Sequence, residues 1–108
     1  MEEVLAVLTN APDEATAQDI AHRLVGAGLA ACVNVLAPCR SVYRWQGAVE
    51  TAQEVPLLIK TTRARYAEVQ AAIADAHPYE VPEIVALPVA DGLPTYLDWV
   101  RAETGSPR

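Results

Sequence analysis

The chain has 108 residues, of which 52% are hydrophobic and 20% are charged, a composition that supports one packed domain and argues against disorder. The formal net charge is −6 at pH 7, which disfavours nucleic acids and anionic membranes as partners, because phosphate groups are bound by clustered Lys and Arg. No apolar run reaches the length of a membrane span, and an acidic start is the reverse of a signal peptide, so we expect a cytoplasmic protein.

The first third of the chain alternates between extended and helical patterns. Residues 2–9 form an apolar run after two charges and predict a strand that is buried on both faces. Residues 10–28 predict a helix with Pro12 in its first turn, ended by two glycines. Residues 29–37, rich in small and β-branched side chains, predict a second strand that ends at Pro38.

Residues 41–62 predict a long β-hairpin. Two extended runs are separated by Gln46-Gly47, a dipeptide that favours a tight turn between antiparallel strands. Because the arm is long for so small a protein, we expect it to project beyond the body of its own subunit.

The remaining residues predict a helix, a strand and a further helix. Thr62 is expected to cap a helix that ends near His77, since a residue before proline avoids the helical conformation. Residues 83–89 then predict a strand, and residues 92–103 predict a helix with Pro94 in its first turn. We expect one domain over residues 1–103 and a disordered tail over 104–108.

This order of elements predicts an α+β fold of the ferredoxin-like, split βαβ type, in which two helices cover one face of an antiparallel sheet. The other sheet face would be bare in a single subunit. The apolar alternation of the strands therefore predicts that further copies of the chain cover it, in a closed cyclic assembly.

Motifs of common enzymes are missing from the sequence. It has no Ser-His-Asp ordering, no Gly-rich phosphate loop and no HExxH. Glu80 and Glu83 do not form a carboxylate pair on one helix face, because Pro82 breaks helical register between them. We therefore predict neither an enzyme nor an organic cofactor.

Several segments, taken in order, resemble the CutA family of divalent-cation tolerance proteins. They are APDEATAQDIA (11–21), GLAACVNVL (28–36), SVYRWQG with Glu50 (41–50), IKTT (59–62), HPYEVPEIVALPV (77–89) and YLDW (96–99). The resemblance covers almost the whole chain. It implies a ferredoxin-like fold assembled as a homotrimer whose hairpin arms pair across subunits, in an architecture like that of the PII signalling proteins. It also implies a role in tolerance to copper and other divalent cations.

The resemblance transfers only part of a copper site. In part of the family, copper ligands are assigned to a Cys in the loop after the first strand and to a His-His pair before Pro-Tyr. This chain has Thr9 or Asn10 at the loop position and Ala76-His77 at the pair, so only His77 carries over. Many relatives also have Lys after the hairpin glycine, where this chain has Ala48.

The candidate ligands for copper or another divalent cation are His77 and Cys39, because copper accepts imidazole and thiolate. The alternative for His77 is a capping role at a helix end, where an imidazolium faces the negative end of the helix dipole. The alternative for Cys39, which lies in a predicted loop, is a plain free thiol. Cys32 is expected to be buried as a small hydrophobe.

A second set of residues is predicted to lie at the junction between subunits, either as interface packing or as a ligand cleft. Lys60 and Glu83 are expected to form an ion pair there. The full set is Lys60, Tyr79, Glu83, Trp45, Tyr43 and Trp99.

These observations favour a non-enzymatic, trimeric, cytoplasmic protein that takes part in the response to divalent metal cations and binds them weakly. Two alternatives stay open. One is a PII-like signalling trimer that binds a small anionic metabolite between subunits, and the other is a scaffold that works through trimerisation alone.

Overall fold

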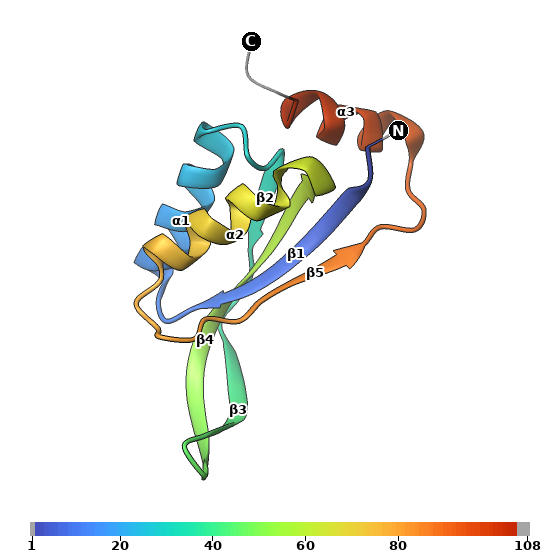
Figure 1. The fold of residues 1–108 in the computed structure, drawn as a ribbon. Coiled ribbons are helices and arrows are strands. Elements are labelled where there is room, and N and C mark those ends of the chain that lie inside the picture. Colours follow the sequence, from blue (N-terminus) through green and yellow to red (C-terminus); the bar gives the residue numbers. More distant parts are fainter. Residues whose placement is uncertain (1, 106–108) are drawn as a thin grey trace.

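A computed structural model describes residues 2–105 of the chain, and its elements follow the predicted order. Figure 1 shows the elements along the ribbon, which are β1 (Val4–Ala11), α1 (Glu14–Gly26), β2 (Cys32–Val35), β3 (Cys39–Trp45), β4 (Ala48–Thr62), a 3-10 turn (Arg63–Arg65), α2 (Tyr66–Ala76), β5 (Ile84–Pro88) and α3 (Pro94–Glu103).

The strands form one antiparallel sheet in the order β2-β4-β1-β5, and β3 pairs with the outer half of the long strand β4. Helices α1 and α2 lie side by side on one face of the sheet, and α3 lies at one end of it (Figure 1). This arrangement confirms the predicted ferredoxin-like α+β fold.

The core lies between the sheet and these two helices. Alternate residues of β1 and β4 point toward the helices, as the period-two pattern requires. The fully or almost fully buried side chains of this layer are Leu5, Val7, Leu57 and Ile59 from the sheet and Ile20, Leu24, Val69 and Ile73 from the helices.

The helix ends differ from the prediction in two places. Helix α1 begins after Pro12, and Asp13 is its N-cap: the carboxylate accepts the Thr16 N–H at 2.7 Å, which lowers the pKa of Asp13. Thr62 does not cap a helix with its side chain, so that prediction was wrong. A 3-10 turn precedes α2, and the Thr62 hydroxyl instead lies 3.4 Å from that of Thr104.

The hairpin confirms its predicted turn. Gln46 and Gly47 have φ values of 48° and 80°, and positive φ at both central residues is the signature of a type I′ turn, whose twist suits a two-residue hairpin. The arm projects well beyond the helices and the rest of the sheet (Figure 1). Cys39 was predicted in a loop, but it is the first residue of β3 and pairs with Glu54 of β4.

Helices α1 and α2 leave the other face of the sheet open. Leu8 lies between Leu58 of β4 and Val85 of β5 in the strand register, and Ala6 pairs with Leu87. Side chains of paired residues share a face, so these residues form an apolar surface opposite the core. Val85 and Leu87 are 45% and 51% exposed.

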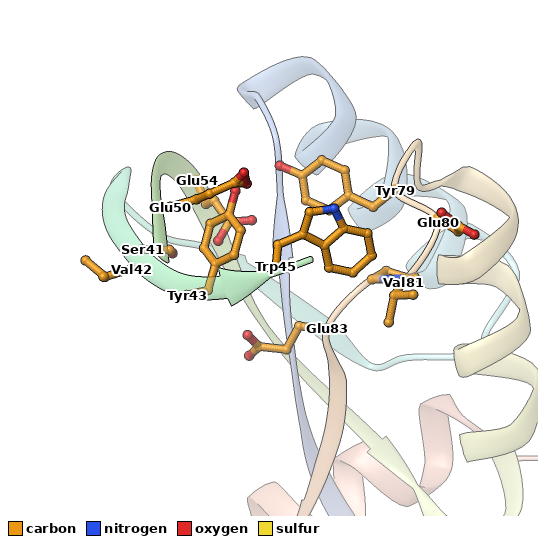
Figure 2. A pocket seen from close by; sticks show the side chains of 11 residues that line it. Ser41, Val42, Tyr43, Trp45, Glu50, Glu54, Tyr79, Glu80, Val81 and Glu83 are labelled. Atoms are coloured by element: carbon orange, nitrogen blue, oxygen red, sulfur yellow. The ribbon is translucent and has the colours of Figure 1, made fainter. Parts of the chain in front are cut away.

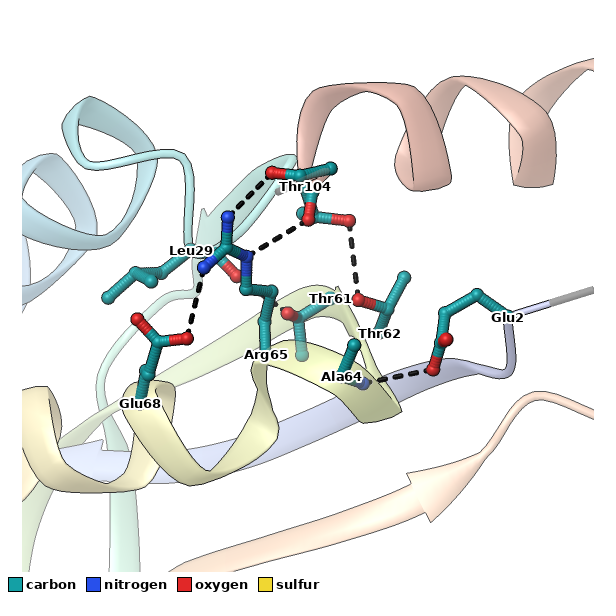
Figure 3. Close-up of polar contacts among 9 residues, drawn as sticks. Glu2, Leu29, Thr61, Thr62, Ala64, Arg65, Glu68 and Thr104 are labelled. Atoms are coloured by element: carbon teal, nitrogen blue, oxygen red, sulfur yellow. Dashed lines mark hydrogen bonds and ion pairs between the residues drawn. The ribbon is translucent and has the colours of Figure 1, made fainter. Parts of the chain in front are cut away.

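The ordered domain extends past the predicted boundary at residue 103. Thr104 is buried, and Arg65 donates from Nε to the Thr104 carbonyl at 3.1 Å and from Nη2 to the Gly105 carbonyl at 2.6 Å (Figure 3). The predicted tail therefore starts too early, because an arginine in the turn before α2 holds these two carbonyls. Residues 106–108 of the predicted tail lie outside the described residues.

Candidate functional site

A cleft of about 660 Å³ lies between the hairpin arm and the loop that leads from α2 to β5. Figure 2 shows its polar and aromatic lining, which comes from β3, β4 and this loop. The residues that give the cleft its chemical character are Tyr43, Trp45, Glu50, Glu54, Tyr79, Glu80 and Glu83.

The strand register explains how the hairpin contributes to the cleft. Tyr43 pairs with Glu50 across the two strands, so their side chains lie on one face of the ribbon. Trp45 lies on the same face, because successive side chains of a strand alternate. The opposite wall is a short loop that contains Pro78 and Pro82, whose fixed φ angles limit its conformations.

Glu54 is the buried charge of this site. It is only 8% exposed, and within residues 2–105 no basic side chain lies at ion-pair distance from it. The Tyr79 hydroxyl points toward it (Figure 2). Burial is the larger cause, and the negative charge of Glu54 the second, of a raised pKa for the Tyr79 hydroxyl. This hydroxyl therefore stays protonated near neutral pH.

His77 is held by hydrogen bonds at both ring nitrogens. Its Nε2 lies 2.6 Å from the Asn10 carbonyl, and its Nδ1 accepts the Tyr79 N–H at 3.2 Å. This pattern assigns the proton to Nε2 of a neutral ring. His77 is 7% exposed, and its ring packs on Tyr79 with 4.6 Å between the ring centroids. A metal ion that binds His77 must therefore displace one of these bonds.

Cys39 is exposed, and its Sγ lies 3.7 Å from the Ser41 hydroxyl. Because Cys39 pairs with Glu54, a thiol and a carboxylate lie on the same face of the ribbon, at the base of the arm. Residues 2–105 contain no group of three or more His, Cys, Asp or Glu side chains placed to hold a metal ion.

Two residues of the predicted cleft lie elsewhere. Lys60 hydrogen-bonds to Asn34 on the open face of the sheet, whereas Glu83 accepts from Asn10 at 3.2 Å. Within one subunit Lys60 and Glu83 therefore do not pair with each other, and the ion pair expected at the junction between subunits stays a prediction. Trp99 is on α3, where its ring centroid lies 5.7 Å from that of Tyr96. Tyr43, Trp45, Tyr79 and Glu83 line one cleft within a single subunit, and their predicted place at a junction between subunits stays a prediction.

Glu50 and Glu54 line the cleft but are absent from the set of cleft residues predicted from the sequence. A usable signal was nevertheless present. Once Gln46-Gly47 is taken as the turn, counting outward along both strands places Glu50 opposite Tyr43 and Glu54 opposite Cys39, as the structure shows.

Because of Tyr96, we expect the folded protein to lose stability at alkaline pH. Its hydrogen bond with Cys32, whose Sγ lies 3.3 Å from the hydroxyl, and then burial raise its pKa to about 12. An unfolded tyrosine titrates near pH ~10, so the unfolded chain loses this proton first as pH rises. The contribution of Tyr96 is therefore complete below about pH 10 and is lost as the pH approaches about 12.

Thermal unfolding of the wild type and Tyr96→Phe across this range tests the prediction. We expect the Tm of the wild type to fall more steeply above about pH 10, so that the two curves converge. Tyr66→Phe serves as the matched control and should fall in parallel with the wild type. Parallel curves for Tyr96→Phe as well would contradict the assignment.

The fold and the cleft together define a ferredoxin-like α+β protein with a projecting hairpin arm and an acidic, aromatic cleft at its base. The sequence model of the CutA1 family, described as the CutA1 divalent ion tolerance protein, matches residues 5–103. The chain therefore belongs to the CutA1 family.

Individual relatives agree with this assignment. The divalent-cation tolerance protein CutA of Thermus thermophilus is 50% identical over 105 residues, which are 97% of this chain and 100% of the relative, and that of Citrobacter koseri is 41% identical over 93% and 87%. The solved Thermus thermophilus Cut A1 structure superimposes on this chain with a TM-score of 0.91. The crystal structure of CutA1 from Shewanella sp. SIB1 superimposes with a TM-score of 0.93, and its sequence is 38% identical over 96% of this chain and 97% of that one.

A further solved relative, from Archaeoglobus fulgidus, is described as a periplasmic divalent cation tolerance protein; it is 35% identical over 97% of this chain and all of that one, with a TM-score of 0.87. In the part of this chain that the structure describes, no helix is both long enough and apolar enough to cross a membrane.

Proposed function

We propose that this protein is a non-enzymatic, cytoplasmic homotrimer that takes part in tolerance to divalent cations by binding them weakly, with copper as the principal ion. The observation that supports metal binding best is the pairing of Cys39 with Glu54 at the base of the hairpin. A thiolate and a carboxylate on neighbouring strands are a ligand pair for a borderline or soft ion.

Weak binding follows from the small number of ligands. A tight zinc or copper site has three or four protein ligands, and residues 2–105 provide no such group. His77 is a possible third ligand only if the ion displaces its bond to Asn10 or to Tyr79. Binding through His77 would therefore carry an additional cost.

The open face of the sheet supports the trimer. Leu8, Leu58, Val85 and Leu87 form an apolar surface on this face, and surfaces of this kind mark subunit contacts in soluble proteins. Among the described strands, β5 lies at one end of the sheet order, so its outer edge is unpaired within residues 2–105 and a second copy can cover it.

Calorimetric titration tests the metal ligands. Zn(II) is added to the reduced protein, and copper is added anaerobically as Cu(I), because Cu(II) oxidises free thiols. We expect Cys39→Ala to weaken binding by at least about tenfold, since it removes the strongest donor, and His77→Ala to change it less. Equal heats from the wild type and the Cys39→Ala/His77→Ala double variant would remove both residues from the site.

The alternative of an anionic metabolite in the cleft is disfavoured by its charge. Four glutamates and no Lys or Arg are found among the described residues that line it, and these carboxylates repel an anion. The scaffold alternative predicts no heat with either metal.

A further inference from the structure

We propose that the cleft between the hairpin arm and the α2–β5 loop binds a small organic cation, a primary alkylammonium or an alkylguanidinium. This site overlaps the metal ligand pair at Glu54, but it uses other residues of the cleft and does not depend on the proposed function.

The first argument is the uncompensated charge of Glu54. Glu54 is a largely buried residue, 8% exposed, and no basic side chain of residues 2–105 lies at ion-pair distance from it, so a cation that reached its carboxylate would be favoured. The carboxylate faces the cleft, and the Tyr79 hydroxyl points toward it (Figure 2). A donor that enters the cleft would supply the missing partner.

The second argument is the aromatic lining. Tyr43, Trp45 and Tyr79 surround the space next to Glu54 and Glu50 (Figure 2). The faces of aromatic rings attract cations, tryptophan most strongly, and the attraction is largest for ions that shed water easily. A carboxylate at one end and aromatic rings at the sides fit an ammonium or guanidinium head with an apolar stem.

The lining also distinguishes an organic cation from a bare metal ion. A metal ion such as Mg²⁺ or Ca²⁺ needs six or more oxygen ligands at about 2.0–2.6 Å. The described residues offer no group of three or more ligands placed for one, and Glu83 is already engaged by Asn10. A space of about 660 Å³ is far larger than a metal site and lies within the range of small-molecule pockets.

A second copy of the chain is the competing occupant. Arg40 and Arg44 pair with Gln53 and Val49 on the opposite face of the hairpin from Tyr43 and Glu50, so they point away from the cleft of their own subunit. A neighbouring subunit could insert either guanidinium into the cleft. Both occupants share one chemistry, and the experiment below separates them.

Tryptophan fluorescence provides the test, because the chain has 2 Trp residues and only Trp45 lines the cleft. In a Trp99→Phe background, the full-length protein in its solution assembly is titrated with butylammonium and butylguanidinium, with butyrate as the anionic control. We expect saturable changes with both cations and none with butyrate. Glu54→Gln should weaken binding by at least about tenfold.

Two matched variants keep the interpretation clear. Glu103 is an exposed carboxylate on α3 and is not part of the cleft lining, so Glu103→Gln should bind normally. Cys39→Ala should also bind the organic cations normally while it loses metal, and this separates the two sites. Circular dichroism confirms that each variant is folded, and Glu50→Gln supplies a second carboxylate variant if Glu54→Gln is not.

Three results would overturn the proposal. They are the absence of saturation with either cation at concentrations up to about 50 mM; equal affinity in Glu54→Gln and Glu103→Gln; and binding that arises only after Arg40→Ala or Arg44→Ala. The last of these would assign the cleft to an arginine of a second copy.

Discussion

Leu57→Ala is expected to lower the free energy of unfolding by about 2–5 kcal/mol. Leu57 has no exposed surface and lies in β4, the strand that joins β1 to β2, where it pairs with Thr9 on one side and Val35 on the other. Its side chain packs in the layer between the sheet and helices α1 and α2, so truncation leaves a cavity that the paired strands cannot close. Chemical denaturation at one protein concentration measures the loss, since unfolding of an oligomer depends on concentration.

Val25→Ala is the matched control. Val25 lies on α1 and is 45% exposed. Its replacement by alanine removes a comparable apolar group from the same structural layer without opening the core. We expect a change of no more than about 1 kcal/mol. Similar losses for both variants would show that the layer around Leu57 is not the main source of stability.

The fold was predictable because its strongest signals are local. The alternation of apolar residues in β1 and β4 specifies which face of each strand is buried, and Gln46-Gly47 fixes the hairpin turn and with it the register of both strands. What the pattern missed depends on residues far apart in the chain. Arg65 holds the carbonyls of Thr104 and Gly105, and nothing near residue 104 signals this contact.

The cleft was predictable only in part for a similar reason. Tyr43, Trp45, Tyr79 and Glu83 line one cleft within a subunit, since aromatic residues on a projecting arm and on a stiff loop have few other places to pack, and their place at a junction between subunits stays a prediction. Lys60 does not join them. Parity along β4 places Lys60 with Leu58 on the open face of the sheet, so within one subunit it lies outside this cleft.

Glu54 shows the converse error. Nothing in its residue type marks it as buried, and only the register and the position of the α2–β5 loop make it a buried charge. Burial of a single carboxylate depends on tertiary contacts, which composition and periodicity do not encode.

Leu87→Asp is expected to dissociate the proposed trimer, with a rise in the dissociation constant of at least about a hundredfold, because each copy would bury an unpaired carboxylate in the interface. Leu87 pairs with Ala6 on the open face and is 51% exposed within one subunit. The variant chain therefore keeps its own core intact, and analytical ultracentrifugation of the wild type and the variant across a range of concentrations measures the shift.

Ala71→Asp provides the control for added charge, since Ala71 is exposed on α2, on the helical side of the sheet. It should leave the assembly unchanged, because in the proposed trimer the helices face solvent and the open sheet face is the contact. Dissociation by both variants would point to a general effect of net charge, which is already −6 per chain. A trimer that survives Leu87→Asp but not Ala71→Asp would place the subunit contact on the helices. Only the loss of assembly in Leu87→Asp alone assigns the contact to the apolar face formed by β1, β4 and β5.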